Sequence, residues 1–216
     1  MTKKNPRYII FTILYSCLNS RKSFKLIFDH TIQKYPLKSI DIAFILNISK
    51  GVFRERRILD QNILLYSKSK KIDKKSLILL YIGAYQLLYC NSIPNYASIN
   101  TTVDLAKIVA NSSSAFINAI LRRISKAPYN VRKSLKVESP DIYYSYPKWI
   151  LDKLYKTYNK KAYSICETNA TQPPLWFRIN QLKITPDDIS EIFNKNKIVF
   201  SQDITLSNYF KVKKFD

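Results

Sequence analysis

The stretch LILLYIGAYQLLYC, residues 77–90, is the longest run of uncharged, mostly apolar residues in the chain. Its fourteen residues fall short of the roughly 20 that a membrane-spanning helix needs, so we expect a helix buried in protein and no membrane partner. Asp73 precedes this run, and aspartate is a residue type that caps helix N-termini. Because apolar side chains lie nearly all round it, the stretch predicts the central helix of an all-helical bundle.

Further helices are expected on both sides of this one. Pro6 suits a first helical turn, Ser23 suits the cap of a second helix, and Ser39 or Asp41 suits the cap of a third, longer one. Apolar residues at spacings of three and four predict these helices at about 6–18, 24–32 and 41–63, and two more at 99–109 and 114–126.

The remainder of the chain has a different organisation. Residues 127–147 contain three prolines and little periodicity, which indicates a linker. Two short helices are expected at 148–158 and 160–169, followed by a strand at 175–180, a helix at 186–194 and a strand at 198–201. The fold class is therefore mainly α: a helical domain over 1–126, the linker, and a small, truncated α/β subdomain over 148–216.

The charge of the chain indicates a polyanionic partner. Thirty-six Lys and Arg against fifteen Asp and Glu give a formal charge of +21, which favours nucleic acid. Residues 1–126 hold 21 of these bases and six acids, a net +15. The alternative is that an AT-rich genome has inflated the lysine content, although such a bias works against arginine codons.

Glycines and cysteines limit the possible chemistry. Gly51 and Gly83 are the two glycines of the chain; both fall in apolar helical stretches, where they indicate close helix packing and not a cofactor loop. The three cysteines are far apart in sequence, so neither a disulfide framework nor a metal cluster is expected, and a reduced, cytoplasmic setting follows. His30 has no Cys or acidic cluster beside it, so no metal site is predicted.

Several segments in a fixed order resemble the NusB-like domain, a helical bundle that binds RNA. They are Leu80 to Tyr89, then Ile93-Pro94, Ile99-Asn100, Val103 to Lys107, and Phe116 to Arg123. The later segments Tyr146 to Ile150, Asn169 to Pro174 and Phe177 to Thr185 resemble the linker and first RNA-recognition strand of the RsmB (Sun or Fmu) family. The resemblance covers about residues 6–200.

The resemblance implies an enzyme family that transfers a methyl group from S-adenosylmethionine to C5 of a cytosine in small-subunit ribosomal RNA. That chemistry needs a thiolate that adds to C6 of the pyrimidine. The family's glycine-rich cofactor loop, its acidic ribose-binding residue and its two motif cysteines have no counterpart here, and Cys166 cannot be assigned as nucleophile. We therefore expect RNA binding without catalysis, no cofactor in this chain, and a separate catalytic half as a possible partner.

The candidate RNA contacts are basic residues near helix ends and one strand. Basic side chains neutralise phosphates, and arginine also stacks on splayed bases. Trp149 and Trp176 are expected as core anchors, with the alternative that Trp176 offers a stacking surface. Arg54, Arg56 and Arg57 are weaker candidates, because Glu55 and Asp60 can pair with them at helical spacing. The predicted RNA-binding residues are Lys3, Lys4, Arg7, Arg122, Arg123, Lys126, Arg178 and Asn180.

Two alternatives stay open on the sequence. One is a stand-alone transcription antitermination factor of the NusB kind, against which the segment Arg178-Ile179-Asn180 argues. The other is a degenerate gene product whose basic surface reflects composition and binds little.

Overall fold

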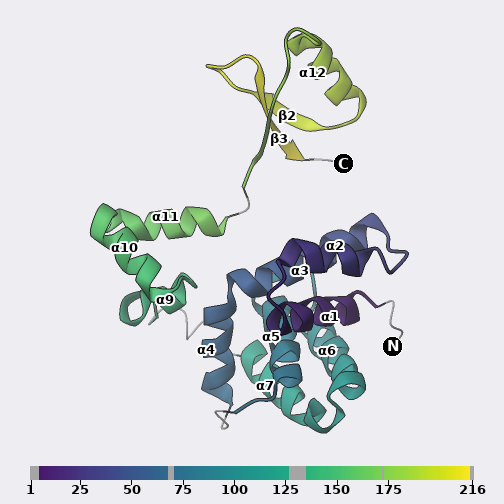
Figure 1. Cartoon of the computed structure of the whole chain (residues 1–216), viewed down its shortest axis with the longest axis vertical. Coiled ribbons are helices and arrows are strands. Elements are labelled where there is room, and N and C mark those ends of the chain that lie inside the picture. Colours follow the sequence, from purple (N-terminus) through teal and green to yellow (C-terminus); the bar gives the residue numbers. More distant parts are fainter. Residues whose placement is uncertain (1–4, 68–70, 127–134, 172, 215–216) are drawn as a thin grey trace. The chain divides into compact units, whose positions relative to one another are not determined.

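Helix α5 (Lys74–Tyr89) lies at the centre of the first part of the computed structural model (Figure 1). Residues 5–67, 71–126, 135–171 and 173–214 are described by the structure. The Asp73 side chain caps the helix by accepting a hydrogen bond of 3.0 Å from the Ser76 backbone N–H. Residues 78–86 are all buried, because α1, α3, α4, α6 and α7 pack around the helix. The predicted central helix is confirmed.

The surrounding helices begin and end close to the predicted positions. The side chains of Asn5 and Ser23 cap α1 and α2 by accepting backbone hydrogen bonds, and a short 3-10 turn, Asn111–Ser113, precedes the last helix of the bundle. The bounds of these helices are α1 Pro6–Asn19, α2 Phe24–Ile32, α6 Asn95–Val109 and α7 Ser114–Lys126.

Both glycines sit at tight helix contacts, as expected. A Cβ at Gly83 would lie 2.5 Å from Leu121 Cδ1, so glycine lets α5 approach α7. A Cβ at Gly51 would overlap the ring of Tyr85. Neither position has room for a larger residue without movement of a buried neighbour.

The predicted third helix is in fact two helices. α3 (Ser39–Arg54) ends at Glu55, whose backbone leaves helical geometry at φ −97° and ψ 13°, and α4 (Arg56–Tyr66) follows. The Glu55 carboxylate is 3.2 Å from Arg54 Nε and accepts a hydrogen bond of 3.0 Å from the Tyr89 hydroxyl. The bend therefore has a buried, paired acid at its corner. The cap position of α3 is Lys38, and not Ser39 or Asp41.

The segment predicted as a linker differs from expectation where it is described. Residues 127–134 lie outside the described residues, but 135–138 are helical and α9 (Pro140–Tyr143) follows. The backbone N–H of Arg57 donates to Ser145 Oγ at 3.1 Å, and Arg57 Nη1 lies 3.5 Å from Asp141 Oδ2. These contacts attach the segment to α4, so it is folded onto the helical unit.

Two more helices, α10 (Lys148–Tyr158) and α11 (Lys161–Ala170), enclose a small second core. The first compact unit, Met1–Cys166, ends within α11. Leu151 and Cys166 are buried in the second core with Tyr144, and the Tyr144 and Tyr163 rings stack 5.4 Å apart. The second compact unit begins at Glu167.

The second unit, Glu167–Asp216, contains a three-stranded antiparallel sheet and one helix. The strands are β1 (Leu175–Arg178), β2 (Val199–Gln202) and β3 (Tyr209–Lys214), in the order β1-β3-β2, and the helix is α12 (Pro186–Lys195). Thr185 and Asp188 form a capping box at the start of α12. The mainly α fold with a small α/β unit is confirmed, whereas β1 ends two residues before the predicted Asn180 and β3 was not predicted.

Candidate nucleic-acid interface

Arg7 is partly buried at the surface of the helical bundle. Its Nε donates to Oε1 of buried Gln86 at 3.0 Å, and its guanidinium lies 5.2 Å from the ring centre of Phe44. Burial lowers the pKa of Arg7, an effect that Coulombic interaction with Cys90 opposes. This predicted RNA contact therefore joins α1 to α3 and α5. Lys3 and Lys4 lie outside the described residues.

The last turns of α7 present a basic, exposed surface. Arg122, Arg123 and Lys126 are exposed, while Ile120, Leu121 and Ile124 on the opposite side are buried. Arg123 Nη1 donates to the backbone oxygen of Tyr66 at 3.3 Å, which ties this side chain to the end of α4. Arg122 and Lys126 are four residues apart and so share one side of the helix.

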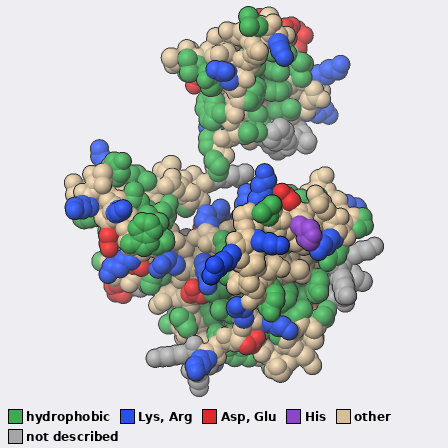
Figure 2. Space-filling model, viewed as in Figure 1, with side chains coloured by type: hydrophobic (Ala, Val, Ile, Leu, Met, Phe, Trp, Pro, Cys, Tyr) green, Lys and Arg blue, Asp and Glu red, His purple; other side chains and the backbone are tan. Residues whose placement is uncertain are grey.

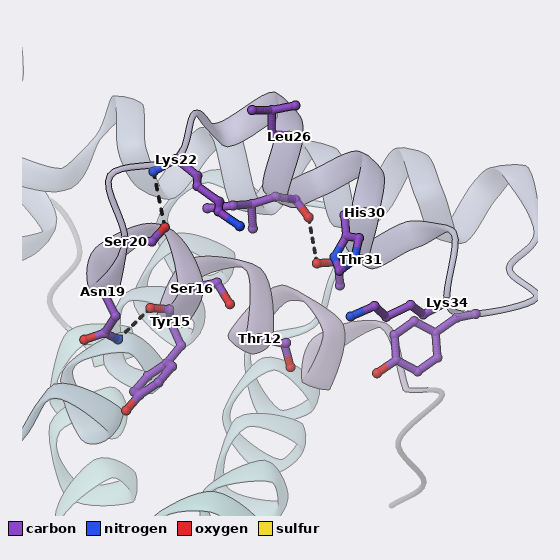
Figure 3. Close-up of a pocket in the computed structure, with 12 residues that line it drawn as sticks. Thr12, Tyr15, Ser16, Asn19, Ser20, Lys22, Leu26, His30, Thr31 and Lys34 are labelled. Atoms are coloured by element: carbon purple, nitrogen blue, oxygen red, sulfur yellow. Dashed lines mark hydrogen bonds between the residues drawn. The ribbon is translucent and has the colours of Figure 1, made fainter.

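A groove of about 700 Å³ lies between α1 and α2. Figure 3 shows the side-chain nitrogens of Lys22 and Lys34 directed into it from opposite ends, with Thr12 and Ser16 of α1 along its floor. Figure 2 shows further Lys and Arg side chains around the purple His30. Residues 21–38 hold five bases and one acid, Asp29. The groove has the volume of a ligand-binding site, and the residues around it carry a net positive charge.

Glu55 and Asp60 were the expected partners of the arginines of α3 and α4, and the structure confirms only the first. Arg54 pairs with Glu55 as expected. Asp60 instead accepts a hydrogen bond from the Tyr81 hydroxyl, and Arg57 pairs with Asp141. Arg54 and Arg57 therefore each have an acidic partner within the fold.

In the second unit, Arg178 lies at the end of β1 and is exposed. Its register partner on β3 is Tyr209, and the next pair on the same face of the sheet is Trp176 with Lys211. Lys211 Nζ lies 5.9 Å from the ring centre of Trp176. Neither tryptophan is the core anchor that the sequence suggested, since Trp149 is 65% and Trp176 44% exposed.

Asn180 does not alternate with Arg178 on a strand, because the strand has ended. The Asn180 side chain accepts a hydrogen bond of 3.1 Å from the Leu182 backbone N–H, and its backbone oxygen accepts from Lys183 and Ile184. Intervening Ile179 is buried. The geometry gives Asn180 a turn-forming role.

Sequence reasoning missed Lys22, Lys34 and Lys211 as members of basic surfaces. Lys211 could have been found, because Tyr209, Lys211 and Lys213 alternate with apolar Phe210 and Val212, the pattern of a strand with one exposed face. Lys22 and Lys34 are twelve residues apart in flanking loops, and the fold is needed to place both at one groove.

No helix among the described ranges is both long and apolar enough to cross a membrane. No group of three or more potential metal ligands occurs in the part of the chain that the structure describes.

The molecule is thus a basic helical bundle followed by a small α/β unit. Residues 4–126 match the NusB family, and the chain belongs to that family. Residues 146–213 match the ferredoxin-like domain of RsmF/B-like methyltransferases.

Named relatives are similar to most or to part of this chain. The probable ribosomal RNA small subunit methyltransferase B of Synechocystis sp. is 31% identical over 87% of this chain and 43% of its own length. The corresponding protein of Shigella boydii is 31% identical over 65% of this chain and 33% of its own. The chain thus spans less than half the length of these methyltransferases. Transcription antitermination protein NusB of Acetivibrio thermocellus is 31% identical over 58% of this chain and 90% of its length.

Solved structures share the fold. The crystal structure of PH0851 aligns with a TM-score of 0.63 at 13% identity, covering 99% of this chain and 49% of that one. NusB of T. maritima aligns with a TM-score of 0.52 at 19% identity, covering 59% of this chain and 92% of the other.

Proposed function

We propose that this chain binds small-subunit ribosomal RNA, as the N-terminal part of an RsmB-type, S-adenosylmethionine-dependent 16S rRNA (cytosine-C5) methyltransferase. The observation that carries the proposal is the combination of a NusB-family bundle and an RsmF/B-like ferredoxin-like domain in one chain. The similarity to the methyltransferase B of Synechocystis, which extends over both, supports the same interpretation.

Basic surfaces in both units support an RNA-binding role. In the bundle these are the end of α7, with Arg122, Arg123 and Lys126, and the groove between Lys22 and Lys34. In the second unit Arg178 and Lys211 lie on the sheet. We retain Lys3 and Lys4 as proposed phosphate contacts, whereas the hydrogen bond from Arg7 to Gln86 favours a positioning role for Arg7.

The described residues do not fit the methyl-transfer chemistry. A cofactor loop needs glycines where the backbone approaches the ligand, but Gly51 and Gly83 both fill helix contacts. Burial raises the pKa of Cys17 and of Cys90, where the positive charge of Arg7 opposes the effect, and Cys166 is buried. We therefore propose that these residues contribute RNA binding in the cytoplasm, and that S-adenosylmethionine and the catalytic thiolate belong to a part of the enzyme outside them.

The second candidate function is stand-alone transcription antitermination. The likeness to NusB of Acetivibrio thermocellus over 90% of its length favours it. It leaves residues 146–213, with their likeness to a methyltransferase domain, without a role, so ribosomal RNA binding is the better-supported function.

The test is fluorescence anisotropy of the whole chain with a labelled fragment of small-subunit ribosomal RNA, measured across a salt series. An unrelated RNA of equal length and folding energy is the control ligand. We expect tighter binding to the ribosomal fragment, with an affinity that falls steeply as salt rises because phosphate contacts release counterions.

Equal, weak binding to both RNAs would contradict the proposal and would favour a basic surface set by composition. Tight binding to both RNAs at low salt, with no difference at physiological salt, would also reject selective recognition, since non-specific binding is almost wholly electrostatic.

A further inference from the structure

The two faces of the β1-β3-β2 sheet differ in chemistry. One face packs against α12, where Phe193 contacts the rings of Phe177, Phe200 and Phe210 at centroid distances of 5.1 to 6.4 Å. Phe210 is fully buried there. This face supplies the core of the unit, and every second strand residue belongs to it.

The remaining strand residues point to the opposite side, which we call the open face. It carries Trp176 and Arg178 from β1, Ser201 from β2, and Tyr209, Lys211 and Lys213 from β3. Lys211 is the register partner of both Trp176 and Ser201, so it occupies the middle of the face. Arg178 and Lys213 are exposed.

Trp176 is 44% exposed although it lies in a strand with a well-packed opposite side. An indole left this open on a sheet offers a flat apolar surface to a ligand. Its cationic neighbour Lys211, with Nζ 5.9 Å from the ring centre, supplies a positive charge beside that surface.

Charge is unevenly distributed across this unit. Helix α12, behind the sheet, carries the acids Asp187, Asp188 and Glu191 and one base, Lys195. The strand bases Arg178, Lys211 and Lys213 lie on the open face. An anionic ligand is therefore attracted to the side where the tryptophan is exposed.

We propose that the open face binds an unpaired nucleotide of RNA, with the base stacked on the Trp176 indole and the adjoining phosphates contacted by Lys211 and Arg178. This inference rests on the proposed RNA-binding function and specifies its ligand in the second unit. A base must leave the helical stack to lie against an aromatic ring, so duplex RNA is a poor ligand for this face. Tyr209 provides a second ring beside Arg178.

The chain carries a matched control for this pair. Trp149 on α10 is 65% exposed, and Lys153 Nζ lies 5.9 Å from its ring centre. The two tryptophans thus share exposure and a lysine at the same distance, but Trp149 projects from a helix and lacks the neighbouring strand bases. Since these are the two tryptophans of the chain, each single Phe variant leaves one fluorescent reporter.

The experiment titrates the full-length variants Trp149→Phe and Trp176→Phe with single-stranded oligouridylate and with a blunt RNA duplex of equal charge, following indole emission. We expect strong quenching of Trp176 by the single strand, weak quenching by the duplex, and little response from Trp149. Anisotropy then measures affinity for the single strand, for which Trp176→Ala should cost about tenfold, Trp176→Phe clearly less, and Trp149→Ala nothing.

The possible outcomes distinguish failure of the stacking site from failure of the proposed RNA-binding function. If ribosomal RNA binds selectively but Trp176 is neither quenched nor needed for single-strand affinity, the stacking site is wrong and the RNA-binding function stands. If no RNA binds, both fail. A third outcome is that RNA does not change Trp176 emission, but the emission shifts to the blue at concentrations where sedimentation shows self-association. The open face is then a protein contact, and the inference is overturned. Circular dichroism of Trp176→Ala checks its fold, and Trp176→Phe keeps the test decisive if that variant unfolds.

Discussion

Arg7 Nε donates a 3.0 Å hydrogen bond to Oε1 of Gln86, which joins the first turn of α1 to the last turns of α5. Gln86 is 1% exposed, and its amide nitrogen also donates to the backbone oxygen of Ile82. A charged side chain thus satisfies a buried amide.

Replacing Arg7 by Met should lower stability more than RNA affinity. The change leaves the Gln86 oxygen without its donor, and a buried hydrogen bond to a charged group contributes about 1.5–3 kcal/mol; partial exposure of Arg7 places the expected loss at the lower end. Urea denaturation measures the loss. Unchanged stability with a large fall in RNA affinity would show that Arg7 contacts RNA, as the sequence predicted.

Neutralising the end of α7 should weaken RNA binding in a salt-dependent way. In the variant Arg122→Gln/Lys126→Gln, we expect the slope of log affinity against log salt to fall by about one for each phosphate that the variant no longer neutralises. Lys107→Gln is the control, because this exposed lysine pairs with Asp104 at 3.0 Å on α6. Equal effects per charge removed in the two variants would indicate a general charge effect and no RNA contact at α7.

The groove between α1 and α2 should contribute to RNA affinity through its two lysines. Lys22→Gln/Lys34→Gln removes both ammonium groups that point into the groove, and we expect a fall of at least fivefold at low salt, roughly 1 kcal/mol by the usual conversion. Lys25→Gln/Lys38→Gln is the matched control, since Lys25 on α2 and Lys38 at the start of α3 are exposed but do not line the groove. Anisotropy with the ribosomal fragment would disprove a groove contact if the two pairs behaved alike.

Gly51→Ala should destabilise the bundle. The new methyl group would overlap the ring of Tyr85, which is 3% exposed and stacked on Tyr89. Overpacking of this kind costs about 1–3 kcal/mol, more than the roughly 1 kcal/mol that alanine gains over glycine inside a helix.

Thermal and urea unfolding of Gly51→Ala and Gly51→Ala/Tyr85→Leu check the mechanism. The second variant removes the ring that causes the overlap, so the glycine substitution should cost less in that background than in the native one. An equal cost in both backgrounds would place the strain elsewhere.

Local sequence signals sufficed for most of the bundle. Asp73 and Ser23 cap helices because their side chains can reach the backbone N–H three residues ahead, and such short-range rules need no knowledge of the fold. Gly51 and Gly83 could be assigned to packing because they sit in apolar periodic stretches.

Other features depend on contacts between distant residues. The bend at Glu55 was missed because helix propensity continues through it, and its carboxylate is held by Tyr89, 34 residues away. Arg7 was interpreted as an RNA contact because Gln86, 79 residues further along, could not be placed beside it. The pairing of Trp176 with Lys211 requires β3, whose alternating pattern was not recognised.

Helix α12 carries three acids and one base, and the open face carries the bases Arg178, Lys211 and Lys213, so the second unit has a dipole moment between these two sides. In the field of an RNA polyanion, a torque acts on such a unit and turns its positive side toward the phosphates before any contact forms. A larger share of diffusional encounters then begins in a productive orientation. The association rate constant is therefore higher than it would be for a unit with the same contacts but no dipole moment. Because salt screens this torque over about 10 Å at 0.1 M, ionic strength should slow association more than it speeds dissociation.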